Sequence, residues 1–197
     1  MISFSRRTKI ASSFVGIVIV GYAAVHFVQG GGVPRDFTDA REQGAIIGQT
    51  IVNLSNSSTA SLEQVNTMDN RGDYADALTL TTQLVSQSQD IRDQAVALSA
   101  QVEQMTRALS GISDLSARQA ALESISNRLA LINQLVNYSA DLSKLLDTLR
   151  ARFSGKGGSA AQVTALVNQV NTDVNAINNF NAQAGQAMDR FDAIMGK

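Results

Sequence analysis

One proline, Pro34, occurs in this chain of 197 residues, and the rest of the sequence after it is free of that helix breaker. Aromatic side chains are also scarce, with seven Phe, three Tyr and no Trp to provide bulk. Proline interrupts helices, whereas sandwiches and barrels are built from many short strands separated by turn residues. The composition therefore favours long helices over an all-β fold.

Apolar and small residues after Pro34 recur at alternating spacings of three and four, in four successive stretches. This spacing places them on one face of a helix and is typical of coiled-coil-like packing. The first stretch is the weakest, because small hydroxyl residues occupy its centre. It runs through Ile47, Ile51, Leu54, Ser58, Ser61, Val65 and Met68. The second runs through Ala77, Thr81, Leu84, Ser88, Ile91, Ala95, Leu98, Val102, Met105 and Leu109.

The third stretch combines two apolar stripes. Together they make a wide apolar face, which predicts contacts with two neighbouring helices. One stripe is Leu122, Ile125, Leu129, Ile132 and Val136, and the other is Leu131, Leu135, Tyr138, Leu142, Leu145 and Leu149. The fourth stretch keeps its register throughout. It runs through Val163, Val167, Val170, Val174, Ile177, Asn181, Ala184, Met188, Phe191 and Met195.

Turn and capping residues separate the stretches. Gly72 suits the left-handed conformation that ends a helix, and Asp73 is placed to cap the next helix. We expect Gly111 and Ser113 to have the same two roles before the third helix. The first helix is expected to start near Thr38 or Asp39, with Glu42 in place for a capping box. Ser159 and Gln162 have the spacing of a capping box at the start of the fourth helix.

The expected helices cover about 38–70, 73–110, 113–153 and 159–195. Short connections between helices of similar length make neighbours antiparallel. The predicted fold is therefore all-α, with an N-terminal transmembrane helix followed by an antiparallel up-down four-helix bundle with coiled-coil-like heptad packing. The main alternative is a pair of long helical hairpins that complete their cores only by pairing with another chain.

The segment at 10–28 is an apolar run that follows three basic residues. A helix over this run would span about 28 Å at ~1.5 Å per residue, close to the ~30 Å hydrocarbon core of a bilayer. A cleaved signal usually has a shorter apolar run, so we expect a transmembrane anchor, the alternative being cleavage after Ala23 or Gly30. The anchor residues are Ile10, Phe14, Val15, Ile17, Val18, Ile19, Val20, Val25 and Phe27.

Arg6, Arg7 and Lys9 set the expected orientation, because basic residues beside an anchor stay in the cytoplasm. The predicted organisation is a cytoplasmic stub at 1–9, the anchor at 10–28, a Gly/Pro hinge at 29–37, and a periplasmic or extracellular bundle at 38–197. Three consecutive glycines and a proline disfavour a continuous helix through the hinge.

The residue types that common catalytic and metal chemistry requires are largely missing. The chain has no cysteine, and its one histidine, His26, falls within the apolar run. Thiolate chemistry is excluded, and a Ser/His/Asp triad or a di-iron bundle lacks its histidines. A net charge of −1 argues against a nucleic-acid partner, which requires a basic face. We therefore expect no enzyme activity, no cofactor and no metal site.

Asn181 occupies a position on a predicted apolar stripe, and so do the hydroxyl residues Thr81, Ser88, Ser58 and Ser61. A buried Asn in a coiled coil lowers stability and fixes the register or the number of partners. The alternative interpretation is a polar cavity for a small ligand. The sequence leaves both interpretations open.

These features predict a single-pass membrane protein whose exported bundle is a structural, scaffolding or assembly component of a cell envelope. Its expected partners are the lipid bilayer and other envelope or membrane proteins, and a homo-oligomer is compatible with the pattern. The alternative is a ligand-sensing bundle that signals through a partner membrane protein.

Overall fold

The computed structural model describes residues 32–196, and this part of the chain is entirely helical apart from its connections. The long helices are α1 (Arg35–Arg71), α2 (Tyr74–Ala108), α3 (Leu115–Phe153) and α4 (Ala160–Met195). A short 3-10 turn, η1 (Leu109–Gly111), follows α2. The all-helical prediction is confirmed. The predicted anchor and the basic residues before it lie outside the described residues.

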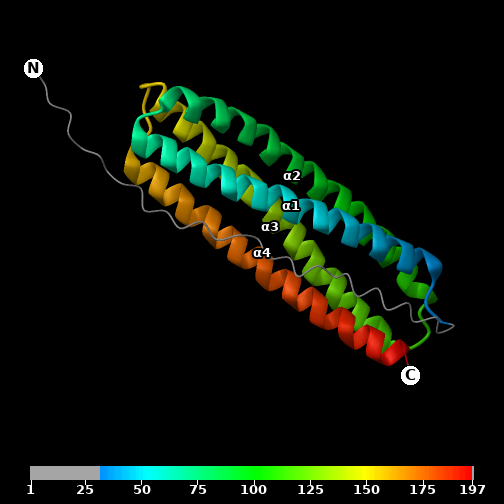
Figure 1. Ribbon diagram of the computed structural model, residues 1–197. Helices are drawn as coiled ribbons and strands as arrows, with labels where there is room; N and C mark the ends of the chain where they lie inside the picture. Colours follow the sequence, from blue (N-terminus) through cyan, green and yellow to red (C-terminus); the bar gives the residue numbers. More distant parts are fainter. Residues whose placement is uncertain (1–31, 197) are drawn as a thin grey trace, which may run out of the picture.

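The four helices lie side by side along a common axis, with their connections at the two ends (Figure 1). The closely packed pairs are α1 with α2, α2 with α3, and α3 with α4, whereas α1 and α4 approach each other less closely. The wide apolar face predicted for the third helix is therefore confirmed, because α3 packs against two neighbours. Within residues 32–196, no helix is both long and apolar enough to cross a bilayer.

The core follows the predicted stripes closely in α2 and α4. In the first stretch, Ile51, Ser58 and Val65 are buried, whereas Ile47, Leu54, Ser61 and Met68 are only half-buried. Every residue of the second stretch, from Ala77 to Leu109, is buried, and so is the longer α3 stripe from Leu131 to Leu149. In the other α3 stripe, Ile125 and Ile132 are buried, but Leu122 and Leu129 are each 47% exposed. The prediction was wrong for these two leucines, since they lie on the outer flank of the stripe where no helix covers them.

The end of α1 and the start of α4 are formed by the residues that the sequence predicted. Gly72 ends α1 in the left-handed conformation, with φ of 83°. At the start of α4, the Gln162 backbone N–H donates to the Ser159 hydroxyl at 3.2 Å. The Ser159 backbone N–H donates to the Gln162 side-chain oxygen at 2.9 Å, which completes the capping box.

The start of α1 differs from the prediction. The helix begins at Arg35, before Thr38 and Asp39, and Pro34 is its N-cap residue. The Pro34 carbonyl accepts from the backbone N–H groups of Phe37 at 3.1 Å and Thr38 at 3.3 Å. A proline is well suited to this place, because its fixed φ is compatible with a helix start and it has no N–H to leave unpaired.

The connection between α2 and α3 also differs. The side chain of Asp114, rather than Ser113, caps α3 and accepts from the Ala117 backbone N–H at 2.8 Å. Gly111 is not left-handed; a Cβ there would lie 2.7 Å from Pro34 Cγ, so the glycine allows a close approach of the two segments. Asp73 occupies the N-cap position of α2, but its side chain makes no capping hydrogen bond.

Contacts at one end of the bundle tie the first and last helices together. The rings of Phe37 and Phe191 lie 5.2 Å apart between centroids. One turn further along α1, Arg41 donates two hydrogen bonds of 2.7 Å to the Asp192 carboxylate. At the opposite end, Arg152 of α3 pairs with Asp69 of α1 at 3.2 Å. The Phe37–Phe191 and Arg41–Asp192 contacts between α1 and α4 thus both lie at the end where α1 starts and α4 finishes.

Two glycines in the α3–α4 connection provide a matched test of how closely the chain packs at this connection. Gly155 and Gly158 both have left-handed backbones, with φ of 68° and 82°. A Cβ at Gly155 meets nothing within 4 Å, but a Cβ at Gly158 would lie 2.5 Å from the Thr148 carbonyl oxygen. We expect Gly155→Ala to lose roughly 1–2 kcal/mol of unfolding free energy from the backbone alone, and Gly158→Ala to lose clearly more. Urea unfolding measures both, and equal losses would contradict the close approach.

Candidate functional site

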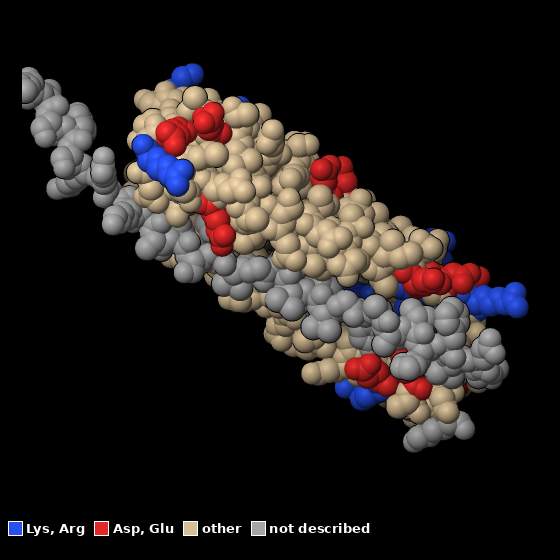
Figure 2. Space-filling model, in the orientation of Figure 1, with Lys and Arg blue, Asp and Glu red and all other residues tan. Residues whose placement is uncertain are grey.

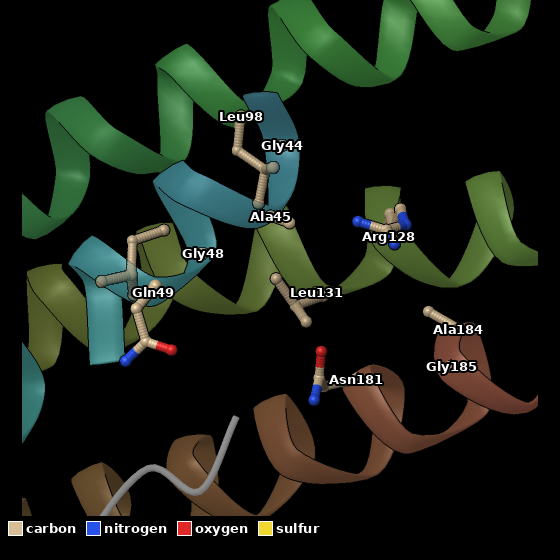
Figure 3. Close-up of a pocket in the computed structure, with 11 residues that line it drawn as sticks. Gly44, Ala45, Gly48, Gln49, Leu98, Arg128, Leu131, Asn181, Ala184 and Gly185 are labelled. Atoms are coloured by element: carbon tan, nitrogen blue, oxygen red, sulfur yellow. The ribbon is translucent and has the colours of Figure 1, made fainter. Parts of the chain in front are cut away.

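The α1–α4 seam opens into a small cavity in the half of the bundle that holds the Phe37–Phe191 contact. We call this region the α1–α4 groove. It is lined by Gly44, Ala45, Gly48, Gln49 and Ile51 of α1, Leu98 of α2, Arg128 and Leu131 of α3, and Asn181, Ala184 and Gly185 of α4 (Figure 3). The cavity holds about 40 Å³.

Small residues keep the groove open. A Cβ built at Gly48 meets no atom of residues 32–196 within 4 Å, so these residues leave space beside this turn of α1. A Cβ at Gly44 would make only an ordinary contact, 3.5 Å from Leu98 Cδ1. On the facing helix, Ala184 and Gly185 present equally little bulk. The groove therefore results from the lack of side chains where α1 and α4 face each other.

Asn181, which the sequence predicted as a polar residue on an apolar stripe, lies at this groove. It is partly buried and extends from α4 toward Leu131 of α3 (Figure 3). A water molecule needs roughly 10–15 Å³ of such space, whereas ligand pockets usually measure about 300–1,000 Å³. The cavity beside Asn181 is large enough for a few waters, and much smaller than a typical ligand site.

Ser88 lies in a different environment, between α2 and α3. Its hydroxyl donates to the Ser139 carbonyl oxygen at 3.0 Å, and the Ser139 hydroxyl donates to the Ser88 carbonyl oxygen at 2.7 Å. The hydroxyl of Ser143 lies 2.9 Å from that of Ser88. Thr81 donates within its own helix, to the Ala77 carbonyl oxygen at 2.6 Å. The structure thus places Asn181, Thr81 and Ser88 in three separate surroundings rather than around one cavity.

A second polar region, which the sequence pattern did not predict, lies between α3 and α4. We call it the α3–α4 hollow; its lining includes Gln134, Asp141 and Lys144 of α3 and Gln169 and Asp173 of α4. Asp173 is only 2% exposed. Its Oδ1 accepts from the Gln134 amide at 2.7 Å and the Gln169 amide at 3.2 Å. Its Oδ2 is buried and has no hydrogen-bond partner among the described residues.

The surroundings of Asp173 in this hollow shift its pKa. Burial raises the pKa of Asp173 above its usual value, and the neighbouring Asp141 carboxyl raises it further, while the two glutamine amides act in the opposite direction. The only sequence signal was that Asp173 directly precedes Val174 on the buried stripe. Periodicity does not tell which of the positions beside a stripe a neighbouring helix will cover.

Tyr138 lies in the core close to the same region. Burial raises the pKa of its phenol to about 12, and the charge of Asp173 adds to this increase. The Ser55 hydroxyl of α1 lowers the same pKa, although Ser55 Oγ meets no partner in hydrogen-bonding geometry. Tyr138 is therefore a neutral core residue at ordinary pH.

In the part of the chain that the structure describes, no group of three His, Cys, Asp or Glu side chains lies close enough to hold a metal ion. Comparisons with protein-family models, with curated proteins and with solved structures found no match. The functions of the α1–α4 groove and the α3–α4 hollow are therefore inferred from the geometry of these two regions alone.

The unfilled space at Gly48 leads to a stability prediction. Glycine in a helix interior is less favourable than alanine by about 0.5–1 kcal/mol, and the groove has room for the added methyl group. We expect Gly48→Ala to increase the free energy of unfolding by this amount in urea titrations. A loss of stability instead would mean that another group already fills the space beside Gly48.

Proposed function

We propose that residues 10–28 anchor the chain in a membrane and that the exported bundle is a structural, scaffolding or assembly component that binds other envelope or membrane proteins. The length of the apolar run supports the anchor, and Arg6, Arg7 and Lys9 before it support export of the bundle. The observation that carries the interaction is the α1–α4 groove.

The proposed contact is a helix of a partner protein that packs across the outside of the groove, since the cavity itself, at about 40 Å³, holds no more than a few waters. Glycine and alanine line it from both sides, and small residues are what allows helix backbones to approach closely. Arg128 is the one charged residue among those that line it. Uncharged side chains also cover most of the visible bundle surface, where the acidic and basic residues form only small groups (Figure 2). The favoured occupant is therefore a helix with small, uncharged side chains.

The position of the groove supports a membrane protein as this partner. The described chain begins at Gly32, where an added Cβ would lie 3.2 Å from the Met195 side chain, so the anchor would attach at the end where α1 starts and α4 finishes. Gly44 and Ile51 follow the start of α1 by about 14 and 24 Å at ~1.5 Å per residue. In an anchored chain, the groove would face the space just above the bilayer.

The second candidate function is a ligand-sensing bundle that signals through a partner membrane protein. The α3–α4 hollow favours it, because amide, carboxyl and ammonium groups there are able to recognise a small polar molecule. A melting temperature that rises with such a molecule would support this candidate, since a ligand that binds the folded state stabilises it.

Site-specific cross-linking tests the proposed function. A photoreactive side chain replaces Gln49 at the groove or, as the control, Val96, which is 59% exposed on α2. In the native membrane, we expect an adduct of one defined mass from position 49 and none from position 96. Adding Gly48→Leu should fill the groove and reduce the adduct by at least roughly tenfold, which corresponds to ~1.4 kcal/mol of binding free energy.

Two results would count against the proposal. Adducts that form equally at both positions, or that persist with Gly48→Leu while circular dichroism reports an unchanged fold, would remove the groove as the binding surface. An adduct of twice the chain's own mass would replace the partner protein with a second copy of this chain.

A further inference from the structure

The α3–α4 hollow contains a carboxyl oxygen that lacks a donor. Asp173 Oδ1 already accepts two amide hydrogen bonds, from Gln134 and Gln169. Asp173 Oδ2 is buried and has no hydrogen-bond partner in the part of the chain that the structure describes. A buried acceptor left unpaired destabilises a fold by about 1–3 kcal/mol, and more where the group is charged. Something must therefore satisfy this oxygen or neutralise it.

The neighbouring group is a second carboxyl. Asp141 of α3 lines the same hollow as Asp173, and it raises the Asp173 pKa both through its charge and through a side-chain hydrogen bond. Lys144 donates to Asp141 Oδ1 at 2.7 Å. An ionised carboxylate can only accept, so the two side chains can form a hydrogen bond only if one of them is protonated.

The other groups around the pair do not supply the missing donor. The titratable groups described near Asp173 come from α3: Asp141, Lys144 and the neutral Tyr138. Lys144 is exposed and its ammonium is directed to Asp141. From α1, the uncharged Ser55 lies beside Tyr138. A proton between the two carboxyls is the simplest donor for Asp173 Oδ2.

We propose that Asp141 and Asp173 form one proton-binding site between α3 and α4. The bound proton holds the two helices together at this point, and its loss as the pH rises weakens their contact. With the proton bound, one carboxyl donates to the other across the α3–α4 interface. Once the proton is lost, two negative charges face each other and Oδ2 has no donor. Lys144 compensates for one of these charges only, so the contact between the two helices weakens around Asp173.

The sign of the pH effect follows from the direction of the pKa shift. The pKa of Asp173 is raised above its ordinary value of 3.8, first by burial and then by Asp141. The folded state therefore binds the proton more tightly than the unfolded state does. The stabilisation is complete below the ordinary pKa and is lost as the pH rises through the raised pKa.

The test uses the full chain in detergent micelles and compares three proteins: the wild type, Asp173→Asn, and the control Asp93→Asn, an exposed carboxyl on α2. Carboxyl carbon NMR should report a wild-type Asp173 that titrates above the ordinary range and is coupled to Asp141. The melting temperature of the wild type should fall relative to that of Asp173→Asn as the pH rises through this titration. Asp93→Asn should follow the wild type.

Other outcomes overturn the proposal. An Asp173 carboxyl that titrates in the ordinary range, or equal pH dependence of melting in the wild type and Asp173→Asn, would exclude a shared proton. If Asp173→Asn does not fold, Asp141→Asn decides in the same way, because it removes the other half of the pair. A wild-type melting temperature at neutral pH that rises with added Ca²⁺ and not in Asp173→Asn would assign the site to a cation instead.

Discussion

The rest of the bundle depends on the packing of the apolar face of α3 against α2 and α4. The leucines of this face and Tyr138 are buried from Leu131 to Leu149, and α3 packs against both α2 and α4. The first helix joins the bundle mainly through α2. Because α1 and α4 are linked by few contacts other than Phe37–Phe191 and Arg41–Asp192, the seam between them is where a groove can form.

The polar groups inside the bundle fall into two kinds. Around Ser88, each hydroxyl finds a partner across the α2–α3 interface, and a satisfied network of this kind fixes the register of two helices. Asp173 is different, because one of its oxygens has no partner and a second carboxyl lies beside it. A bundle that only had to be stable would do better with an amide at this position. The carboxyl is therefore a better candidate for a role that responds to conditions.

Much of this fold could be predicted from the sequence, because heptad spacing determines which residues face inward. Helix ends were predicted correctly where a single residue suits the role, as Gly72 and Ser159 do. They were wrong where adjacent residues compete, as Ser113 does with Asp114 and Thr38 with Pro34. The groove and Asp173 were beyond prediction, since both depend on how closely neighbouring helices approach, and spacing along one helix contains no information about that distance.

In this structure the four helices of one chain form the bundle together. The decisive measurement is the urea unfolding of a chain that begins at Gly32, followed at several protein concentrations together with sedimentation equilibrium. We expect a monomer that unfolds in one cooperative step, with a midpoint independent of protein concentration. A midpoint that rises with concentration, in a species of twice the mass, would contradict it and indicate two helical hairpins that complete their cores only with a second chain.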